Sequence, residues 1–201
     1  MVRPARERLL SLAARRAVVT ARDATTAGIH SQELTRLVAH GELERVARGQ
    51  YRLPDQPITE HHALALVARA VPGGVICLLS ALGYHGIGTQ LPPDVWVAIE
   101  RRKRQPRLTY PPLRVVTFTG AAFTTGVGIH EIEGQRVKIY SVAKTIADLF
   151  KARNKVGLDV AIEALREAWR ERRFTMAELE RHARTCRVHR VMRPYLEMLG
   201  A

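Results

Sequence analysis

The chain contains 201 residues, of which 32 are basic and 19 are acidic, so its formal net charge is +13. Arginine accounts for 27 of the basic residues and lysine for five. This excess is larger than a solubilising surface needs and implies a polyanionic partner or an acidic protein partner. The hydrophobic fraction of 46% is that of a globular protein and excludes disorder as the default state.

The cysteine content and the hydropathy favour a soluble protein of a reducing compartment. Cys77 and Cys186 stand far apart without a third cysteine, which excludes a disulfide scaffold and a cysteine-rich zinc module. The longest apolar run, residues 73–79, is far shorter than the roughly 20 residues that span a bilayer. The basic N-terminus continues into an amphipathic helix pattern rather than an apolar signal sequence. We therefore expect a cytoplasmic protein.

Helix and turn signals alternate over the first forty residues. An apolar stripe predicts a first helix and consists of Leu9, Leu10, Leu12 and Ala13. Thr20 and Asp23 have the spacing of a capping box for a second, short helix that ends at Gly28. Ser31 is expected to cap a third helix, Gln32 to His40.

Residues 43–53 alternate around Ala47-Arg48-Gly49 and predict a β-hairpin. Helix, short helix, glycine turn, helix and hairpin is the order of a winged helix-turn-helix, whose helix after the turn enters the major groove of DNA. Glutamine pairs with adenine and arginine with guanine, and arginines on the wing suit phosphate or minor-groove contacts. The residues predicted to contact DNA are His30, Ser31, Gln32, Thr35 and Arg36 on the helix and Arg45, Arg48 and Arg52 on the wing. A merely solvated helix face is the alternative for Gln32 and Arg36.

Two prolines in Pro54-Asp55-Gln56-Pro57 interrupt helix and strand pairing alike. They divide the chain into a DNA-binding domain, residues 1–54, and a second domain, residues 60–201. Both parts are basic, with net charges of +4 over residues 1–59 and +9 over residues 60–201. The second domain is predicted to contain a helix over 60–70, a buried segment at 75–78, a short helix over 80–86, strands at 95–99 and 113–118, a hairpin over 129–140, and helices that start at Ser141, Leu158 and Thr175. The predicted fold is therefore α+β: an N-terminal winged helix-turn-helix, then a larger mixed α+β domain with a C-terminal helical part.

The sequence shows no catalytic constellation. Phosphate-loop, HExxH, GxSxG and CxxC signatures are absent. The adjacent pair His61-His62 points to different faces of a helix, and Lys144 and Asp148 have the i,i+4 spacing of an ion pair worth a few tenths of a kcal/mol. Glu131 and Glu133 share a strand face but lack a third metal ligand. We therefore expect no enzyme, no metal and no cofactor; a metal-dependent nuclease that uses Glu131, Glu133 and Asp148 is the enzymatic alternative.

Two clusters of positive charge lie in the second domain. Between two predicted strands, a loop forms a basic patch of Arg101, Arg102, Lys103, Arg104 and Arg107. This patch suits phosphate contacts beside the site read by the winged helix, or docking to an acidic protein, and a solvated loop is the alternative. The other cluster lies in the C-terminal part and comprises Arg166, Arg170, Arg173, Arg181, Arg184, Arg187, Arg190 and Arg193. Glutamates are interleaved with these arginines, so we expect ion pairs within the helices for much of the cluster. The last four arginines lack acidic neighbours.

Several blocks of the chain resemble the AbiEi family of antitoxins. In the N-terminal part, residues 19–29, 34–38 and 41–51 look like the winged-helix domain of that family. The second domain carries the more specific matches, which are Cys77–Leu82 with Tyr84-His85, Leu91-Pro92 with Val95–Ile99, and Tyr140–Phe150 with Arg153–Asp159. The resemblance spans residues 18–170 in all.

The resemblance implies an antitoxin of a type IV toxin–antitoxin system, encoded beside a nucleotidyltransferase-like toxin and connected with phage defence. Its winged helix is expected to repress its own operon by binding inverted repeats in the promoter, as a monomer that occupies the double-stranded DNA in more than one copy. Its second domain is expected to counteract the toxin, functionally or through transient contact. A stand-alone winged-helix repressor with a ligand-sensing C-terminal domain is the alternative.

Overall fold

The computed structural model describes residues 4–16, 18–55 and 59–199. Packing divides these residues into two compact units. Unit 1 comprises the described residues up to Arg69 together with Glu131–Arg136, and unit 2 comprises Ala70–His130 and the described residues from Val137 on. The predicted linker at residues 54–57 falls in part on residues 56–58, outside the described residues. A functional boundary between residues 54 and 60 stays a prediction.

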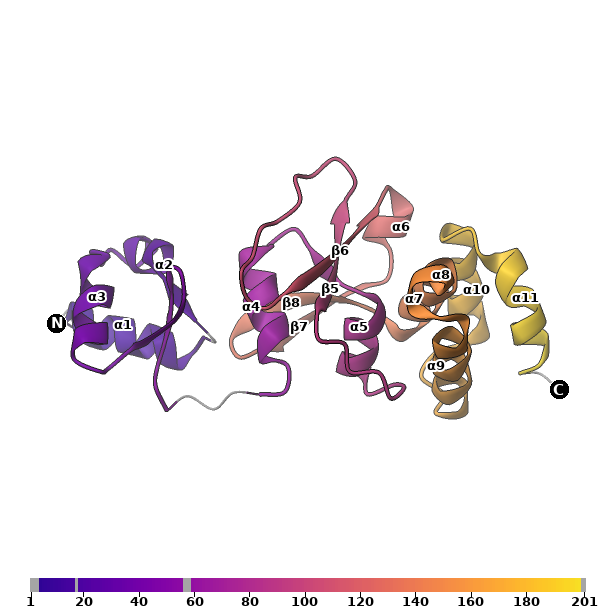
Figure 1. Ribbon diagram of the computed structural model, residues 1–201, viewed down its shortest axis with the longest axis horizontal. Helices are drawn as coiled ribbons and strands as arrows, with labels where there is room; N and C mark the ends of the chain where they lie inside the picture. Colours follow the sequence, from indigo (N-terminus) through magenta and orange to yellow (C-terminus); the bar gives the residue numbers. More distant parts are fainter. Residues whose placement is uncertain (1–3, 17, 56–58, 200–201) are drawn as a thin grey trace. The chain divides into compact units, whose positions relative to one another are not determined.

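The first elements of unit 1 follow the predicted order of helix, short helix, helix and hairpin (Figure 1). These elements are α1 (Ala5–Ala14), β1 (Val19–Thr20), α2 (Ala21–Thr26), α3 (Gln32–Ala39), β2 (Glu44–Ala47) and β3 (Gln50–Arg52). The three strands form an antiparallel sheet in the order β1-β3-β2. Strand β1 was not predicted, because two residues are too few for an alternating pattern. The arrangement is a winged helix-turn-helix whose hairpin gains a third strand.

Helix α2 begins at the predicted capping box. The hydroxyl oxygen of Thr20 accepts a hydrogen bond from the backbone N–H of Asp23, and the Asp23 carboxylate accepts one from the backbone N–H of Thr20 at 2.8 Å. These reciprocal bonds satisfy N–H groups that the first helical turn leaves without partners. Beyond the helix, Gly28 has a φ of +68°, which glycine adopts without steric cost. The chain therefore turns sharply between α2 and α3.

Helix α3 follows the turn as predicted, but its expected cap is wrong. Ser31 precedes the helix in a helical conformation, and its side chain makes no capping hydrogen bond. Instead, Nδ1 of His30 accepts a hydrogen bond of 3.3 Å from the backbone N–H of Gln32. The inward face of α3 buries Leu34 and Leu37 in the core of unit 1. This burial fixes which face of α3 points outward.

Two segments complete unit 1. Helix α4 (His62–Ala70) contributes its residues up to Arg69, and the turn between β7 (Val127–Ile132) and β8 (Gln135–Tyr140) contributes Glu131–Arg136. Both elements were predicted from the sequence, but their grouping with the winged helix was not. Polar contacts between residues far apart in the sequence accompany this grouping, among them those of Arg69 with Asp23 and Gln135 and that of His62 with Glu133.

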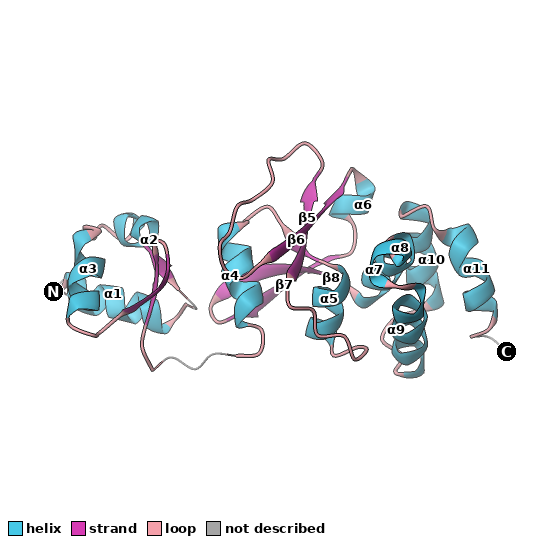
Figure 2. Cartoon of the chain, viewed as in Figure 1, coloured by secondary structure: helices cyan, strands magenta, loops and turns pink. Residues whose placement is uncertain are grey.

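Unit 2 is built around a five-stranded sheet followed by helices (Figure 2). Its further elements are β4 (Val75–Ile76), α5 (Leu78–His85), β5 (Val95–Glu100), β6 (Leu113–Phe118), α6 (Ala121–Thr124), α7 (Val142–Lys151), α8 (Arg153–Val156), α9 (Leu158–Arg170), α10 (Met176–Thr185) and α11 (His189–Glu197). The strand order is β6-β5-β4-β8-β7, with β4 antiparallel to β5 and parallel to β8, and with β5 parallel to β6. Unit 2 is therefore α+β, as predicted.

One apolar core joins this sheet to the C-terminal helices. Trp96 from β5, Tyr140 from β8, Phe150 from α7 and Leu165 from α9 all belong to it. The starts of α7 and α10 carry the predicted caps: the hydroxyl oxygens of Ser141 and Thr175 each accept a hydrogen bond from a backbone N–H three residues on. Among the described residues, no helix combines the length and the apolar composition that crossing a bilayer requires.

Candidate nucleic-acid interface

Helix α3 and the two residues before it expose every residue of the predicted recognition helix that was expected to contact DNA. His30, Ser31, Gln32, Thr35 and Arg36 are all exposed. Their polar side chains lie opposite the buried leucines of the same helix. Glu33 approaches Arg36 at 3.5 Å, an exposed pair that contributes little to stability and leaves the guanidinium available. The arrangement matches that of a recognition helix, and the contacts of these side chains with bases stay a prediction.

The wing carries three arginines in two different environments. Arg45 and Arg48 are exposed, and Arg48 occupies the turn between β2 and β3. Arg52 lies opposite Glu44 in the strand register, and its guanidinium pairs with the Glu44 carboxylate. Because this pair holds Arg52 against the sheet, Arg48 in the turn of the wing is better placed than Arg52 to reach a phosphate.

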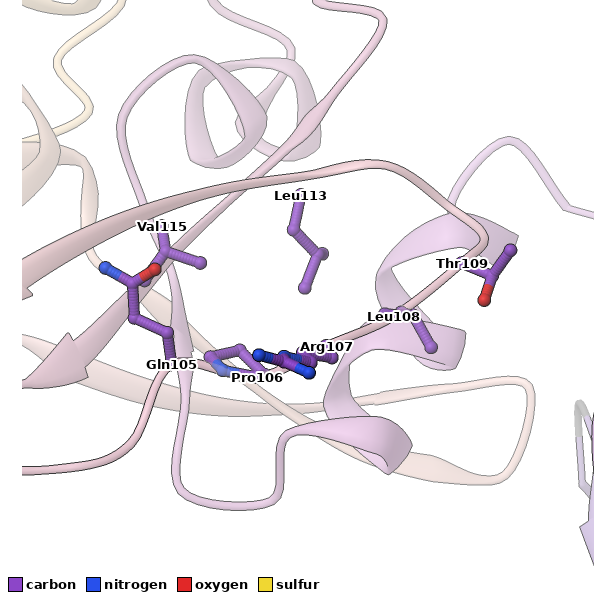
Figure 3. Close-up of a pocket in the computed structure, with 7 residues that line it drawn as sticks. All are labelled: Gln105, Pro106, Arg107, Leu108, Thr109, Leu113 and Val115. Carbon is purple, nitrogen blue, oxygen red and sulfur yellow. The ribbon is translucent and has the colours of Figure 1, made fainter.

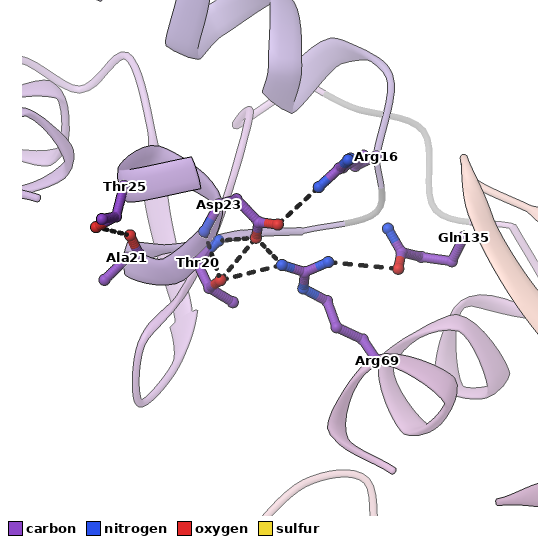
Figure 4. A network of polar contacts seen from close by, with 7 residues as sticks. All are labelled: Arg16, Thr20, Ala21, Asp23, Thr25, Arg69 and Gln135. Carbon is purple, nitrogen blue, oxygen red and sulfur yellow. Dashed lines mark hydrogen bonds and ion pairs between the residues drawn. The ribbon is translucent and has the colours of Figure 1, made fainter. Parts of the chain in front are cut away.

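A polar network fixes the N-terminal end of α2 within unit 1 (Figure 4). The Asp23 carboxylate accepts a hydrogen bond of 2.7 Å from Arg16 and also pairs with Arg69. Arg69 reaches further, donating to the Thr20 hydroxyl at 3.0 Å and to Oε1 of Gln135 at 3.5 Å. Burial lowers the pKa of Arg69, and the neighbouring Arg16 lowers it further. One carboxylate thus serves the helix cap and two arginines together.

A second polar cluster engages the carboxylate of Glu133 in the β7–β8 turn. Oε1 accepts hydrogen bonds from the backbone N–H and the hydroxyl of Thr59 at 2.9 and 2.7 Å, and Oε2 lies 2.6 Å from Nδ1 of His62. Glu131, by contrast, is exposed. The expectation that these two glutamates project together from one strand face is therefore wrong, because Glu133 lies in the turn and is held by Thr59 and by His62, the first residue of α4.

The Lys144–Asp148 pair forms with the predicted i,i+4 spacing, but its setting differs from the expected surface pair. Both side chains are fully buried in unit 2. The Lys144 ammonium lies 4.1 Å from the ring centre of Tyr140, and the other Asp148 oxygen accepts a hydrogen bond of 3.2 Å from the thiol of Cys186. Burial raises the pKa of Asp148 while Lys144 opposes that rise. The stabilisation of a few tenths of a kcal/mol that is typical of an exposed i,i+4 ion pair therefore does not apply to this buried pair.

The predicted basic patch lies in an exposed loop between β5 and β6. Its five members, Arg101, Arg102, Lys103, Arg104 and Arg107, are all exposed. Beside them, residues 105–109 together with Leu113 and Val115 surround a shallow hollow of about 450 Å³ (Figure 3). The loop position is confirmed, and a role in binding phosphate or an acidic protein stays a prediction.

The glutamates of α9 do not pair with arginines as expected. Glu167 accepts a hydrogen bond of 2.8 Å from the backbone N–H of Gly88, and Glu163 accepts one of 3.4 Å from the hydroxyl of Thr89. Both carboxylates are thus turned toward the loop after α5. These two hydrogen bonds could not be predicted from the sequence, because Gly88 and Thr89 lie more than seventy residues from the glutamates.

At the C-terminal end, two of the last four arginines of the second basic cluster have acidic partners after all. Arg184 pairs with Glu180 at 3.6 Å, and Arg193 pairs with Glu197 at 2.8 Å. Both pairs follow the i,i+4 spacing on exposed helices. The expectation that these arginines lack acidic neighbours is therefore wrong for Arg184 and Arg193.

Comparison with known proteins supports the regulator assignment of the N-terminal part. A crystal structure of the RV2827C protein from Mycobacterium tuberculosis matches with a TM-score of 0.60 and 19% sequence identity, over 90% of this chain and 72% of that one. At this identity the likeness shows the fold alone. No curated protein sequence matches the chain. Residues 7–54 match the sequence profile of a family described as "Transcriptional regulator, AbiEi antitoxin". The resemblance is thereby confirmed for the winged helix-turn-helix, whose residues 7–54 are similar to AbiEi antitoxin regulators.

Proposed function

We propose that the protein is the antitoxin of a type IV toxin–antitoxin system and represses its own operon. The observation that carries this proposal is the exposed polar face of α3, with Gln32 and Arg36 beside the arginine-tipped wing, in a segment that matches AbiEi regulators. A helix of this kind enters the major groove, and the wing contacts the adjacent backbone. The partner is double-stranded DNA that carries inverted repeats in the promoter of the operon.

The charge distribution supports binding in more than one copy. Residues 1–59 carry a net charge of only +4, which suffices for a few phosphate contacts per copy. Tight promoter occupancy then requires several copies along the repeats, or a contribution from the basic patch of residues 101–107. We propose a cytoplasmic protein that is monomeric until it binds DNA.

The antitoxin role is assigned to the second domain, residues 60–201, which is proposed to counteract a nucleotidyltransferase-like toxin encoded next to the protein, in a system connected with phage defence. In this proposal the protein is not an enzyme, and the carboxylates of the nuclease alternative support that view: Asp148 is paired and buried, and Glu133 is engaged by Thr59 and His62. The protein counteracts the toxin functionally or through transient contact with it.

Two measurements test the proposal. Fluorescence anisotropy with a labelled duplex of the operon's own promoter should show tighter binding than with a scrambled duplex at the same salt concentration. Co-expression with the adjacent toxin should relieve growth arrest. If the promoter is bound but the arrest persists, a stand-alone repressor with a ligand-sensing second domain replaces the antitoxin role. If neither occurs, the proposal is wrong.

A further inference from the structure

Unit 2 contains a cavity that neither DNA binding nor toxin neutralisation explains. It has a volume of about 510 Å³ and lies where the start of β7, the start of α7 and helix α10 meet. This volume falls within the range of small-molecule sites. Its polar lining includes Ser141, Arg173, Arg181 and His182, and Phe174 contributes an apolar wall.

The imidazole of His182 is the least satisfied polar group of this cavity. The residue is only 8% exposed, it lines the cavity, and its Nδ1 atom has no hydrogen-bond partner among the described residues. A buried polar atom without a partner is uncommon and calls for an explanation. Burial lowers the pKa of His182, and Lys144 and Arg181 lower it further, so the ring is neutral near pH 7 and carries one N–H donor.

The start of α7 adds donors on another side of the cavity. Val142 and Ala143 line it and are the first two residues of that ten-residue helix. The first N–H groups of a helix have no partner within it and favour an anion. The Ser141 hydroxyl accepts from the backbone N–H of Lys144, one residue beyond this pair.

Two arginines provide the positive charge. The guanidinium of Arg173 donates to the carbonyl oxygen of His85 at 3.0 Å and pairs with the Glu171 carboxylate at 3.3 Å, which together fix its position. Arg181 is exposed and, within the described part of the chain, takes part in no hydrogen bond or ion pair that would hold its guanidinium elsewhere. Glu178 also lines the cavity, but its carboxylate accepts hydrogen bonds from the backbone N–H and hydroxyl of Thr175 at 2.8 and 3.0 Å. Arg181 is therefore the arginine of this lining whose charge no carboxylate within the described part of the chain pairs with.

The wall between these groups depends on a close approach of the backbone. Gly126 has a φ of +72°, and a Cβ atom there would lie 2.7 Å from Cβ of Lys144 and 3.0 Å from Cε1 of His182. A side chain at this position would displace the imidazole. Glycine thus brings the β7 backbone against the His182 ring and shapes the cavity.

From these observations we infer that the cavity binds the phosphate group of a small molecule, through the N-terminus of α7, Arg181 and His182. Backbone N–H groups at a helix start together with arginine form a recurrent phosphate-binding combination. The apolar wall at Phe174 leaves room for an organic group attached to the phosphate. The site lies wholly within unit 2 and does not depend on the proposed DNA-binding role.

Isothermal titration calorimetry on the full chain, without DNA and in a phosphate-free buffer, tests this inference with inorganic phosphate and AMP as separate probes. Saturable binding of either probe is expected. Tighter binding of AMP would identify a phosphate monoester as the ligand, and equal affinities would identify inorganic phosphate. No saturable binding of either probe would overturn the inference.

Three variants locate the site. Arg181→Gln, which removes the positive charge, and His182→Leu, which removes the ring N–H donor, are each expected to weaken binding about tenfold or more. Arg190→Gln removes the same charge from an exposed position outside the cavity and should leave the affinity unchanged. Arg181 is exposed, so its variant folds even if replacement of the buried histidine does not, and thermal unfolding checks both. Equal losses in Arg181→Gln and Arg190→Gln, or displacement of AMP by a duplex that lacks the operator, would mean that the protein only attracts phosphates by its general charge.

Discussion

The ammonium of Lys144 donates a hydrogen bond to the carboxylate of Asp148, one helical turn away, and both side chains are excluded from solvent. Charged groups buried in this way are stable only together, because each would otherwise lose its hydration without compensation. The rings of Tyr140 and Phe118, whose centres lie 4.1 and 4.8 Å from the ammonium, stabilise the cation further. The pair is thus part of the core of unit 2.

Breaking this pair should destabilise unit 2 strongly. Lys144→Ala leaves the Asp148 carboxylate buried without its cation, and we expect a loss of about 3–5 kcal/mol in the free energy of unfolding. The double variant Lys144→Met with Asp148→Leu removes both charges and keeps the volume, so it should recover most of that loss. Urea unfolding followed by circular dichroism measures both. A loss below about 1 kcal/mol in the single variant would contradict the argument.

Removing the Asp23 carboxylate should loosen unit 1. Asp23→Ala abolishes the capping box of α2 and leaves Arg69 half-buried without its anion, so we expect a loss of roughly 2–4 kcal/mol. Asp55→Ala changes the charge equally at an exposed position and serves as the matched control. Urea unfolding of the two variants gives the comparison, and equal effects would show that only net charge matters.

Acid should weaken the contact of Glu133 in the β7–β8 turn with Thr59 and with His62 at the start of α4. Burial raises the pKa of Glu133, but hydrogen bonds from His62 and Thr59 outweigh it and leave the pKa below its ordinary value of 4.5. A group with a depressed pKa stabilises the folded state above its unfolded pKa and loses that effect as the pH falls through the folded pKa. Stability should therefore decline below pH 4.5. Glu133→Gln should flatten this decline in urea unfolding midpoints, whereas Glu131→Gln, at an exposed position, should preserve it.

Arg48 at the wing tip is expected to contact a phosphate rather than a base. Arg48→Ala should then weaken binding to promoter and scrambled duplexes alike, and should reduce the slope of log affinity against log salt by about one. Anisotropy titrations at several salt concentrations measure the slope. Arg15→Ala, an exposed arginine at the end of α1, is the control and should leave it unchanged.

Gln32 and Arg36 are expected to read bases. Gln32→Ala and Arg36→Ala should each cost about 1–3 kcal/mol of binding to the promoter duplex and little on the scrambled one, because a base contact discriminates between sequences. Competition titrations with the two duplexes give the ratio. If these variants lower both affinities equally, as Arg48→Ala should, then α3 is not the recognition helix.

Local signals in the sequence were sufficient to predict most of the helices and strands. Thr20, Thr175 and Ser141 mark helix starts because a cap is a contact between near neighbours in the chain. Ser31 failed as a cap because the adjacent His30 accepts the N–H group instead. The alternating strands were also predictable, whereas the parallel pairing of β4 with β8 depends on contacts far apart in sequence.

The candidate sites were less predictable than the fold. The exposure of Gln32 and Arg36 follows from helical periodicity, so the outward face of α3 was predictable from the sequence. The burial of Lys144 was not predictable, since the i,i+4 spacing to Asp148 is the same on a surface helix and in a core. Likewise, the partners of Glu133 and the unsatisfied imidazole of His182 arise from packing between distant segments.

The membership of Glu131–Arg136 in unit 1 has a consequence at the level of the gene. The coding sequence of unit 1 is split, with that of sixty-one residues of unit 2, Ala70–His130, inserted between its two parts. No single stop codon or new start codon can therefore give one whole unit without residues of the other. A shortened reading frame that ends before residue 131 would produce a winged helix in which Thr59 and His62 have lost the carboxylate that joins them.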